Sequence, residues 1–230
     1  MRVRNRGADQ MNWILIRHGM TQGNTERRYV GCRTDEPLCE AGIAKLKEGT
    51  YPDVQKVYTS PMCRCLETAA ILYPTIKAEI IPDFRECDFG EFEYKNYEEL
   101  NGRADYQAWI DSGGELPFPD GESRAEFAAR SFAAFQSIRQ DAGDEDCALI
   151  VHGGTIMSIM EAMANPRGNY YDFQVKNGCG YILKEDGSYT GIGLGGFLPL
   201  GQHFPHPGID VHPVYLLEVF GCHDVGDQPL

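Results

Sequence analysis

Short apolar runs alternate with longer amphipathic segments through most of the chain. The runs have the length and the branched, bulky composition of buried strands, and they are residues 12–16, 56–59, 77–81 and 147–151. Between them lie segments of helical spacing that glycine or proline ends, and residues 122–140 form the clearest amphipathic helix. Strands that alternate with helices predict an α/β fold, a three-layer α/β/α sandwich around a mostly parallel central sheet.

The pattern changes toward the C-terminus. Residues 180–183 and 189–192 flank the turn sequence Glu185-Asp186-Gly187-Ser188, which predicts a hairpin. From residue 193 onward, glycines, prolines and histidines follow no helical or alternating pattern. We therefore expect a disordered leader at 1–11, one domain at 12–192 with a small cap insertion at about 94–121, and an irregular tail at 193–230.

Charge and apolar run length narrow the function classes. The formal net charge of −13 argues against nucleic acid or an anionic membrane surface as a partner. No apolar run approaches the ~20 residues of a transmembrane helix, and the N-terminal arginines precede no signal-peptide core. We expect a cytoplasmic protein that acts on a small molecule, and its oligomeric state is left open.

The eight cysteines and the clustered C-terminal histidines raise the question of disulfides and metals. A chain of this size needs no disulfides, so reduced thiols are expected. No Cys-x-x-Cys pair supports a structural zinc site. The tail histidines have irregular spacing, which favours solvated side chains over metal ligands, and they are His203, His206, His212 and His223.

Two of the predicted strands each deliver a histidine and a glycine to a turn. The first run ends in Arg17-His18-Gly19 and the fourth in His152-Gly153-Gly154. Ligands of open α/β sheets bind at the carboxyl ends of strands, so a cation beside a histidine predicts an anion site with a nucleophile. Each turn alone could instead hold a solvated arginine and a histidine bonded to backbone. The occurrence of two such histidine-glycine turns favours the functional interpretation. We interpret the polar stretch 25–36 as a loop over the site.

A second arginine lies near a predicted helix start. A helix over residues 61–72, with Ser60 as its N-cap, would place Arg64 in the first turn, where backbone N–H groups favour an anion. Its guanidinium would add a two-pronged donor suited to phosphate. A surface ion pair with Glu67 or Glu40 is an equally open alternative at this point.

Glu86 is the best candidate for a general acid. It follows the third strand within a segment that alternates acids with aromatics. Aromatic surroundings raise the pKa of a carboxyl group by desolvation, as acid catalysis near neutral pH requires. We expect the neighbouring Asp88, Glu91 and Glu93 to face solvent or to hold the loop.

Taken together, these motifs resemble the histidine phosphatase superfamily, also called the phosphoglycerate mutase-like fold. The motifs are Leu15-Ile16-Arg17-His18-Gly19-x-Thr21-x-x-Asn24, Arg28-x-x-Gly31-x-x-x-Asp35-x-Pro37-Leu38, Thr59-Ser60-Pro61-x-x-Arg64-x-x-Glu67-Thr68-Ala69, Arg85-Glu86-x-x-Phe89-Gly90-x-Phe92-Glu93, Gly121-Glu122-Ser123 and Val151-His152-Gly153-Gly154. The resemblance covers about residues 12–192, and within the family the pattern is similar to small α-ribazole phosphatase-like bacterial enzymes. Cys39 departs from the usual Thr or Ser, and Tyr94 departs from a common Gly.

The resemblance implies a mechanism for the candidate residues. His18 would attack phosphorus and form a phosphohistidine, while Arg17, Arg64 and His152 stabilise the charge on the phosphoryl oxygens. Glu86 would protonate the leaving oxygen and then activate the water that hydrolyses the intermediate.

The family also implies the ligand-binding residues and the cofactor requirement. Asn24 and Gly153 would bind the phosphate of the substrate. The family needs no metal and no cofactor, because side chains supply the positive charge.

The spacing between the acid and the second histidine bears on the reaction. About 65 residues separate Glu86 from His152, whereas mutases of the family carry longer inserts here, so the resemblance favours a phosphatase with water as acceptor. The expected substrate is a small phosphomonoester, with α-ribazole phosphate or a sugar phosphate as candidates. Phosphoglycerate mutase and a non-catalytic phospholigand-binding module are the alternatives.

Overall fold

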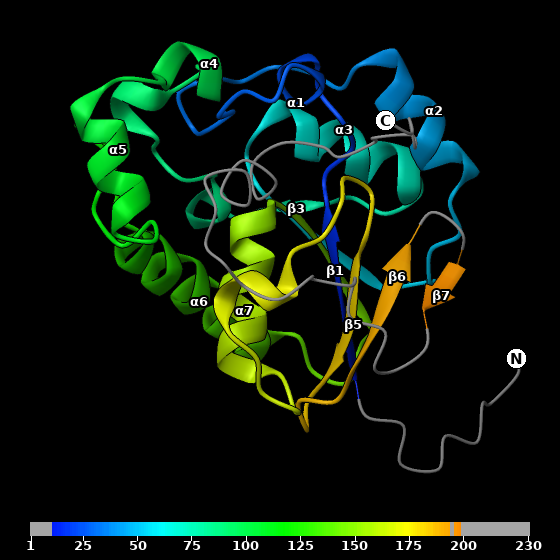
Figure 1. The fold of residues 1–230 in the computed structure, drawn as a ribbon. Coiled ribbons are helices and arrows are strands. Elements are labelled where there is room, and N and C mark those ends of the chain that lie inside the picture. The colour runs from blue at the N-terminus through cyan, green and yellow to red at the C-terminus, as the bar shows by residue number, and fades with distance from the viewer. Residues whose placement is uncertain (1–10, 194–195, 199–230) are drawn as a thin grey trace, which may run out of the picture.

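A seven-stranded mixed sheet forms the centre of the molecule (Figure 1). The computed structural model describes residues 11–193 and 196–198. The strands, in the spatial order β3-β2-β4-β1-β5-β6-β7, are β1 (Asn12–Arg17), β2 (Lys56–Thr59), β3 (Glu79–Ile80), β4 (Cys147–Val151), β5 (Gly180–Lys184), β6 (Tyr189–Gly193) and β7 (Gly196–Leu198). Strands β3, β2, β4 and β1 run parallel, and β5, β6 and β7 continue the sheet antiparallel to their neighbours. The α/β fold and the predicted hairpin are confirmed.

Helices cover both faces of the sheet and complete three layers (Figure 1). The α-helices are α1 (Gln22–Thr25), α2 (Glu40–Glu48), α3 (Cys63–Leu72), α4 (Tyr97–Leu100), α5 (Ala104–Asp111), α6 (Arg124–Asp141) and α7 (Gly153–Met163). Three short 3-10 helices are η1 (Pro82–Phe84), η2 (Gly90–Phe92) and η3 (Tyr170–Phe173). Helices α6 and α7 pack on one face of the sheet, and α3 packs on the other beside α2.

Strand β1 contributes side chains to the hydrophobic core on each face of the sheet. Trp13 and Leu15 pack with α6 and α7, whereas Ile14 and Ile16 pack with α3. Successive side chains of a strand point to opposite faces, so a strand buried on both faces must be apolar throughout. This requirement explains why β1 and the equally buried β4 were the easiest strands to predict.

Helices α4 and α5 belong to the expected cap insertion and lie apart from the sheet (green in Figure 1). A separate cluster of buried side chains packs against them, and its aromatic members include Tyr29, Phe89, Phe92, Trp109 and Phe118. Several of the rings meet edge to face, with centroids 5.0 Å apart for Phe89 and Phe118. The cap therefore has its own core, which encloses the segment that follows Glu86.

Several boundaries differ from the prediction for physical reasons. The third strand shrinks from 77–81 to β3 because only Tyr58 and Thr59 of β2 pair with it at the sheet edge. Met11, expected in the leader, is 8% exposed and packs into the core. At the other end, Gly193 closes β6 and residues 196–198 form β7, where an irregular tail was expected.

The remaining terminal predictions lie outside the described residues. These are the leader at 1–10 and the rest of the tail, with all four of its histidines and Cys222. Within the described part of the chain, no helix is long and apolar enough to cross a membrane.

Candidate functional site

The parallel pairing of β1 with β4 brings the two histidine turns together. Arg17 is in register with Val151, and the His18 backbone N–H donates to the Val151 carbonyl at 2.9 Å. The two histidine rings meet edge to face, with centroids 5.2 Å apart. The structure therefore places the two imidazoles side by side, as the repeated histidine-glycine turns predicted.

The His18 ring is held with one nitrogen available for chemistry. Its Nδ1 lies 2.7 Å from the Gly19 carbonyl oxygen, which can only accept a hydrogen bond, so Nδ1 carries the proton. Burial, followed by the charges of Arg64 and Arg17, lowers the pKa of His18 well below its ordinary value. The ring is therefore neutral near pH 7, and Nε2 carries a free lone pair.

Arg64 is a fully buried cation and not the surface residue that one alternative allowed. Its guanidinium donates to the carbonyls of Thr34, Val30 and Gly31 at 3.0, 3.3 and 3.2 Å. Its Nε has no acceptor among the described residues. Among the residues that the structure describes, no carboxylate forms an ion pair with it, and a buried guanidinium with one N–H available is suited to an anionic ligand.

Helix α3 nevertheless starts later than predicted and does not present its N-terminus as expected. Met62 is the N-cap, and its own side chain makes no capping hydrogen bond. Asp35 instead accepts from the Cys63 N–H at 2.6 Å, so a carboxylate already occupies this helix end. The Asp35 carboxylate therefore takes an N–H group at which the sequence analysis expected a bound anion, whereas Arg64 itself reaches the site.

The N-terminus of α7 lies beside the second cation. Arg17 donates from Nη1 to the Val175 carbonyl at 2.8 Å, and a Cβ added to Gly153 would lie 3.6 Å from its guanidinium carbon. His152 is the N-cap of this 11-residue helix and makes no side-chain capping hydrogen bond. Unsatisfied backbone N–H groups and the helix dipole favour an anion at such a helix end. The neighbouring Gly154 allows close packing, because a Cβ there would lie 2.6 Å from Phe127.

Glu86 comes to the same site from the segment after β3. Its side chain is buried, with Oε1 accepting from the Cys87 N–H at 2.9 Å and Oε2 lying 3.5 Å from His152 Nδ1. Burial raises the pKa of the Glu86 carboxyl, and the charge of Arg64 opposes that rise. The carboxyl therefore holds its proton to higher pH than an exposed glutamate, as the sequence predicted.

Ser60 makes the backbone contact of an N-cap and has a further partner that was not predicted. Its hydroxyl lies 2.8 Å from His152 Nε2 and accepts from the Met62 N–H at 3.3 Å, so it holds the second imidazole. Burial, followed by the charge of Arg64, lowers the pKa of His152 well below its ordinary value. His152 is thus a neutral hydrogen-bonding group in the site.

Asn24 is fixed by a residue that the sequence analysis missed. Asn177 donates from Nδ2 to Asn24 Oδ1 at 3.1 Å and to the His18 carbonyl at 3.1 Å. The Thr21 N–H also donates to Asn24 Oδ1, at 3.2 Å. The Asn24 oxygen is thereby used within the protein, which leaves its NH2 group as the donor for a ligand. No local pattern singles out Asn177, which reaches across 153 residues of sequence.

The other acids and the loop arginines have structural partners. Glu93 accepts from the Gly31 N–H at 3.0 Å, and Arg33 forms an ion pair with Asp88 at 2.7 Å. Arg28 pairs with Glu26 and Glu99 at 2.7 and 2.8 Å. These residues hold the loop 25–36 against the cap.

The seven cysteines in the described part of the chain form no disulfide bond with one another. Cys39 Sγ accepts from the Gly42 N–H at 3.4 Å as the N-cap of α2. In the described part of the chain, no group of three or more His, Cys, Asp or Glu side chains is arranged to hold a metal ion.

The sequence model of the histidine phosphatase superfamily (branch 1) matches residues 13–192. The chain belongs to this superfamily. The match includes β1, β4 and all of the site residues described above, so membership and geometry refer to the same part of the molecule.

The relatives of this superfamily member include proteins named as mutases and proteins named as phosphatases. The probable phosphoglycerate mutase GpmB of Proteus mirabilis is 31% identical over 54% of this chain, and the match spans only 60% of that relative. The adenosylcobalamin/α-ribazole phosphatase of Escherichia coli K12 is 26% identical over 74% of this chain and 87% of its own length. The crystal structure of the α-ribazole phosphatase from Shigella flexneri shares the fold, with a TM-score of 0.66 and 22% identity over 79% of this chain and 89% of that one.

Proposed function

We propose that this histidine phosphatase hydrolyses a small phosphomonoester through a phosphohistidine on His18. The observation that carries the proposal is the juxtaposition of a neutral, oriented His18 ring with Arg17, Arg64, His152 and Glu86. The proposal assigns the catalytic roles to these five residues and substrate binding to Asn24 and Gly153.

In the first step, His18 Nε2 attacks phosphorus and the bond from phosphorus to the ester oxygen breaks. Glu86 gives its proton to the departing oxygen, so the alcohol leaves neutral. Arg64 and Arg17, with the N-terminus of α7, stabilise the negative charge on the phosphoryl oxygens. The Asn24 NH2 group and His152 add hydrogen bonds to the same oxygens.

In the second step, water replaces the alcohol. The Glu86 carboxylate takes a proton from the water, the water oxygen attacks phosphorus, and the bond from phosphorus to His18 Nε2 breaks. Orthophosphate leaves, His18 regains its lone pair, and Glu86 is protonated for the next turnover. Side chains supply every positive charge that these steps use, so the proposal includes no metal and no cofactor.

Two observations favour a phosphatase over a mutase. The cap insertion contains only the short helices α4 and α5 beside its loops. In addition, the α-ribazole phosphatase relative is matched over 87% of its length, against 60% and 74% for the GpmB mutase relatives of Proteus mirabilis and Photorhabdus laumondii. We therefore place α-ribazole phosphate and sugar phosphates first among candidate substrates, and we expect a small phosphorylated molecule as the only partner required for turnover.

A screen against phosphomonoesters from mildly acidic to mildly alkaline pH tests the proposal. Release of orthophosphate from α-ribazole phosphate or a sugar phosphate, abolished in His18→Ala, would support it. Exchange of phosphate between 2- and 3-phosphoglycerate that outpaces hydrolysis would favour the mutase instead. Tight binding of a phosphomonoester without turnover would favour a non-catalytic module.

A further inference from the structure

The segment that carries Glu86 lacks regular secondary structure. Residues 85–89 lie between η1 and η2 and belong to neither a helix nor a strand. A general acid must be held within a fraction of an ångström of the oxygen that it protonates. Side chains from other elements must therefore fix this segment. We call residues 83–88, which include the last two residues of η1, the acid loop.

Arg130, on α6, holds the part of the acid loop that precedes Glu86. Its Nη1 donates to the Asp83 carbonyl at 2.7 Å and to the Arg85 carbonyl at 3.1 Å. A guanidinium that bonds two carbonyls at once fixes their separation and orientation. The main chain is thus tied to α6 immediately before Glu86.

Glu122 holds the part that follows Glu86. Its Oε2 accepts from the Asp88 N–H at 3.0 Å, and its own backbone N–H donates to the Asp88 carbonyl at 2.9 Å. Both ends of the acid loop are therefore bonded, one by a cation and the other by a carboxylate.

The two holding side chains are joined to each other. Arg130 donates from Nε and Nη2 to the two carboxylate oxygens of Glu122 at 2.9 and 2.7 Å. Only 13% and 19% of these side chains are exposed, and the Arg130 guanidinium stacks over the Phe127 ring at 5.1 Å. A two-pronged and largely buried ion pair is rigid in a way that a solvated surface pair is not.

We propose that the Arg130–Glu122 pair is a positioning device that fixes Glu86 for proton transfer. This inference rests on the proposed phosphatase function. Arg130 and Glu122 act through the backbone of the acid loop and not on the substrate, so both are positioning residues.

A positioning role and simple structural support of the fold predict different effects on two kinds of substrate. An alkyl phosphate needs a proton on its leaving oxygen, whereas p-nitrophenol leaves readily without one. Loosening the acid loop therefore slows hydrolysis of an alkyl phosphate and largely spares p-nitrophenyl phosphate. A general loss of folded enzyme would lower both rates by the same factor.

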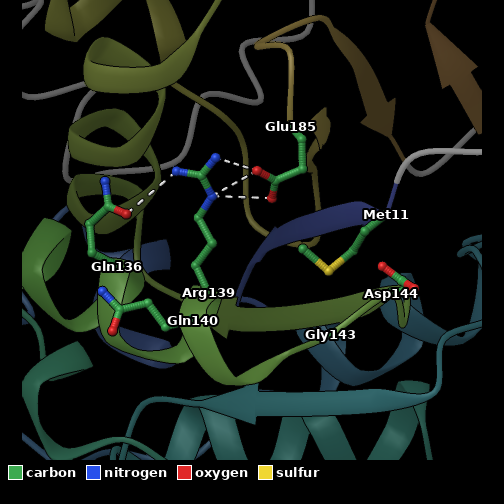
Figure 2. A pocket seen from close by; sticks show the side chains of 7 residues that line it. All are labelled: Met11, Gln136, Arg139, Gln140, Gly143, Asp144 and Glu185. Carbon is green, nitrogen blue, oxygen red and sulfur yellow. Dashed lines mark hydrogen bonds and ion pairs between the residues drawn. The ribbon is translucent and has the colours of Figure 1, made fainter.

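The test compares Arg130→Gln with a matched variant on the same helix. Arg139→Gln also removes an α6 arginine that pairs with a carboxylate, Glu185 (Figure 2). Both residues line a pocket of about 460 Å³. None of the site residues lines this pocket. Arg139 lies nine residues beyond Arg130, or about 13 Å along the helix.

We expect Arg130→Gln to lower kcat/KM for glycerol phosphate by about 10- to 100-fold, since general acid catalysis contributes about 10²–10⁴-fold in enzymes. The value for p-nitrophenyl phosphate should change by less than about threefold, and Arg139→Gln should match the wild type on both substrates. Arg130→Lys and Glu122→Gln, which are smaller changes, should shift the ratio of the two values in the same direction. They also keep the test valid if Arg130→Gln does not fold.

Equal loss on both substrates, or no loss on either, would overturn the positioning role. Amide hydrogen exchange at Cys87 and Asp88 tests the same role without turnover, and it should be faster in Arg130→Gln than in Arg139→Gln. Unchanged exchange would contradict the inference. A wild-type enzyme that hydrolyses neither of these substrates nor any phosphomonoester of the screen would refute the proposed function instead, and the exchange measurement would still decide the role of the pair.

Discussion

Replacing Arg64 with lysine removes a buried two-pronged donor while keeping its charge. The guanidinium holds the carbonyls of Thr34, Val30 and Gly31, which belong to the loop over the site. A lysine ammonium has a shorter reach and a single charged tip, so it cannot span all three. At least one buried carbonyl then loses its partner.

Two quantities should fall in Arg64→Lys. A hydrogen bond to a charged group contributes about 1.5–3 kcal/mol, so the free energy of unfolding should fall by about 2–5 kcal/mol. Loss of one preorganised donor to a transition-state oxyanion costs about 10²–10³-fold in kcat. The Arg64 Nε–H has no acceptor among the described residues, so we expect it to donate to a phosphoryl oxygen of the substrate. Arg64→Lys removes this hydrogen bond.

Denaturant unfolding and kcat on p-nitrophenyl phosphate would measure the two effects. Arg103→Lys is the control, because its partners Glu91 and Asp105 are 56% and 38% exposed and its ion pairs lie at the surface. We expect the control to match the wild type within the error of both measurements. If Arg64→Lys kept its free energy of unfolding within about 1 kcal/mol and its kcat within about tenfold of the wild type, Arg64 would not be a buried transition-state donor.

Three further predictions follow from the site and from α2. Burial raises the pKa of Glu86 above its ordinary value of 4.5, so kcat/KM for an alkyl phosphate should fall as the pH rises through that raised pKa. A pH profile of Glu86→Gln should lack this falling limb, and its presence there would reject Glu86 as the acid. Asn177→Asp places an acceptor against the His18 carbonyl and Asn24 Oδ1, so kcat/KM should fall about tenfold or more; wild-type kinetics would show that the amide is not needed. Cys39→Ser replaces a weak sulfur N-cap with a hydroxyl and should raise the free energy of unfolding by about 0.5–1 kcal/mol, measured by denaturant titration, whereas a decrease would contradict its capping role.

The elements that were predicted well are those whose signal is local. Strands β2 and β4 match the predicted ranges, because a strand buried on both faces is a continuous apolar run bounded by polar residues. The hairpin of β5 and β6 was equally visible from its Gly-containing turn. In contrast, β3 is an exposed edge strand, and its length depends on how much of β2 it can pair with.

The site was predicted as a set of residues but not as a set of contacts. Residue type at strand ends and in the family motifs was enough to predict the two histidines, Glu86 and the arginines. The contact of Ser60 with His152 could not be predicted in this way. A serine before a proline has the local pattern of a helix N-cap, and only the pairing of β2 with β4 brings Ser60 to His152. Asn177 was not predicted either, because its contacts depend on how the turn between η3 and β5 packs and not on a local sequence pattern.

The most direct test of the mechanism is to trap the phosphorylated enzyme. Wild-type protein is mixed with a substrate labelled in its phosphoryl group, quenched rapidly under alkaline conditions, digested and sequenced by mass spectrometry. We expect an acid-labile phosphoryl group on the His18 ring during turnover, and none in His18→Ala, which should also be inactive. Turnover without label on His18, or label on another residue of the active enzyme, would contradict nucleophilic catalysis by His18.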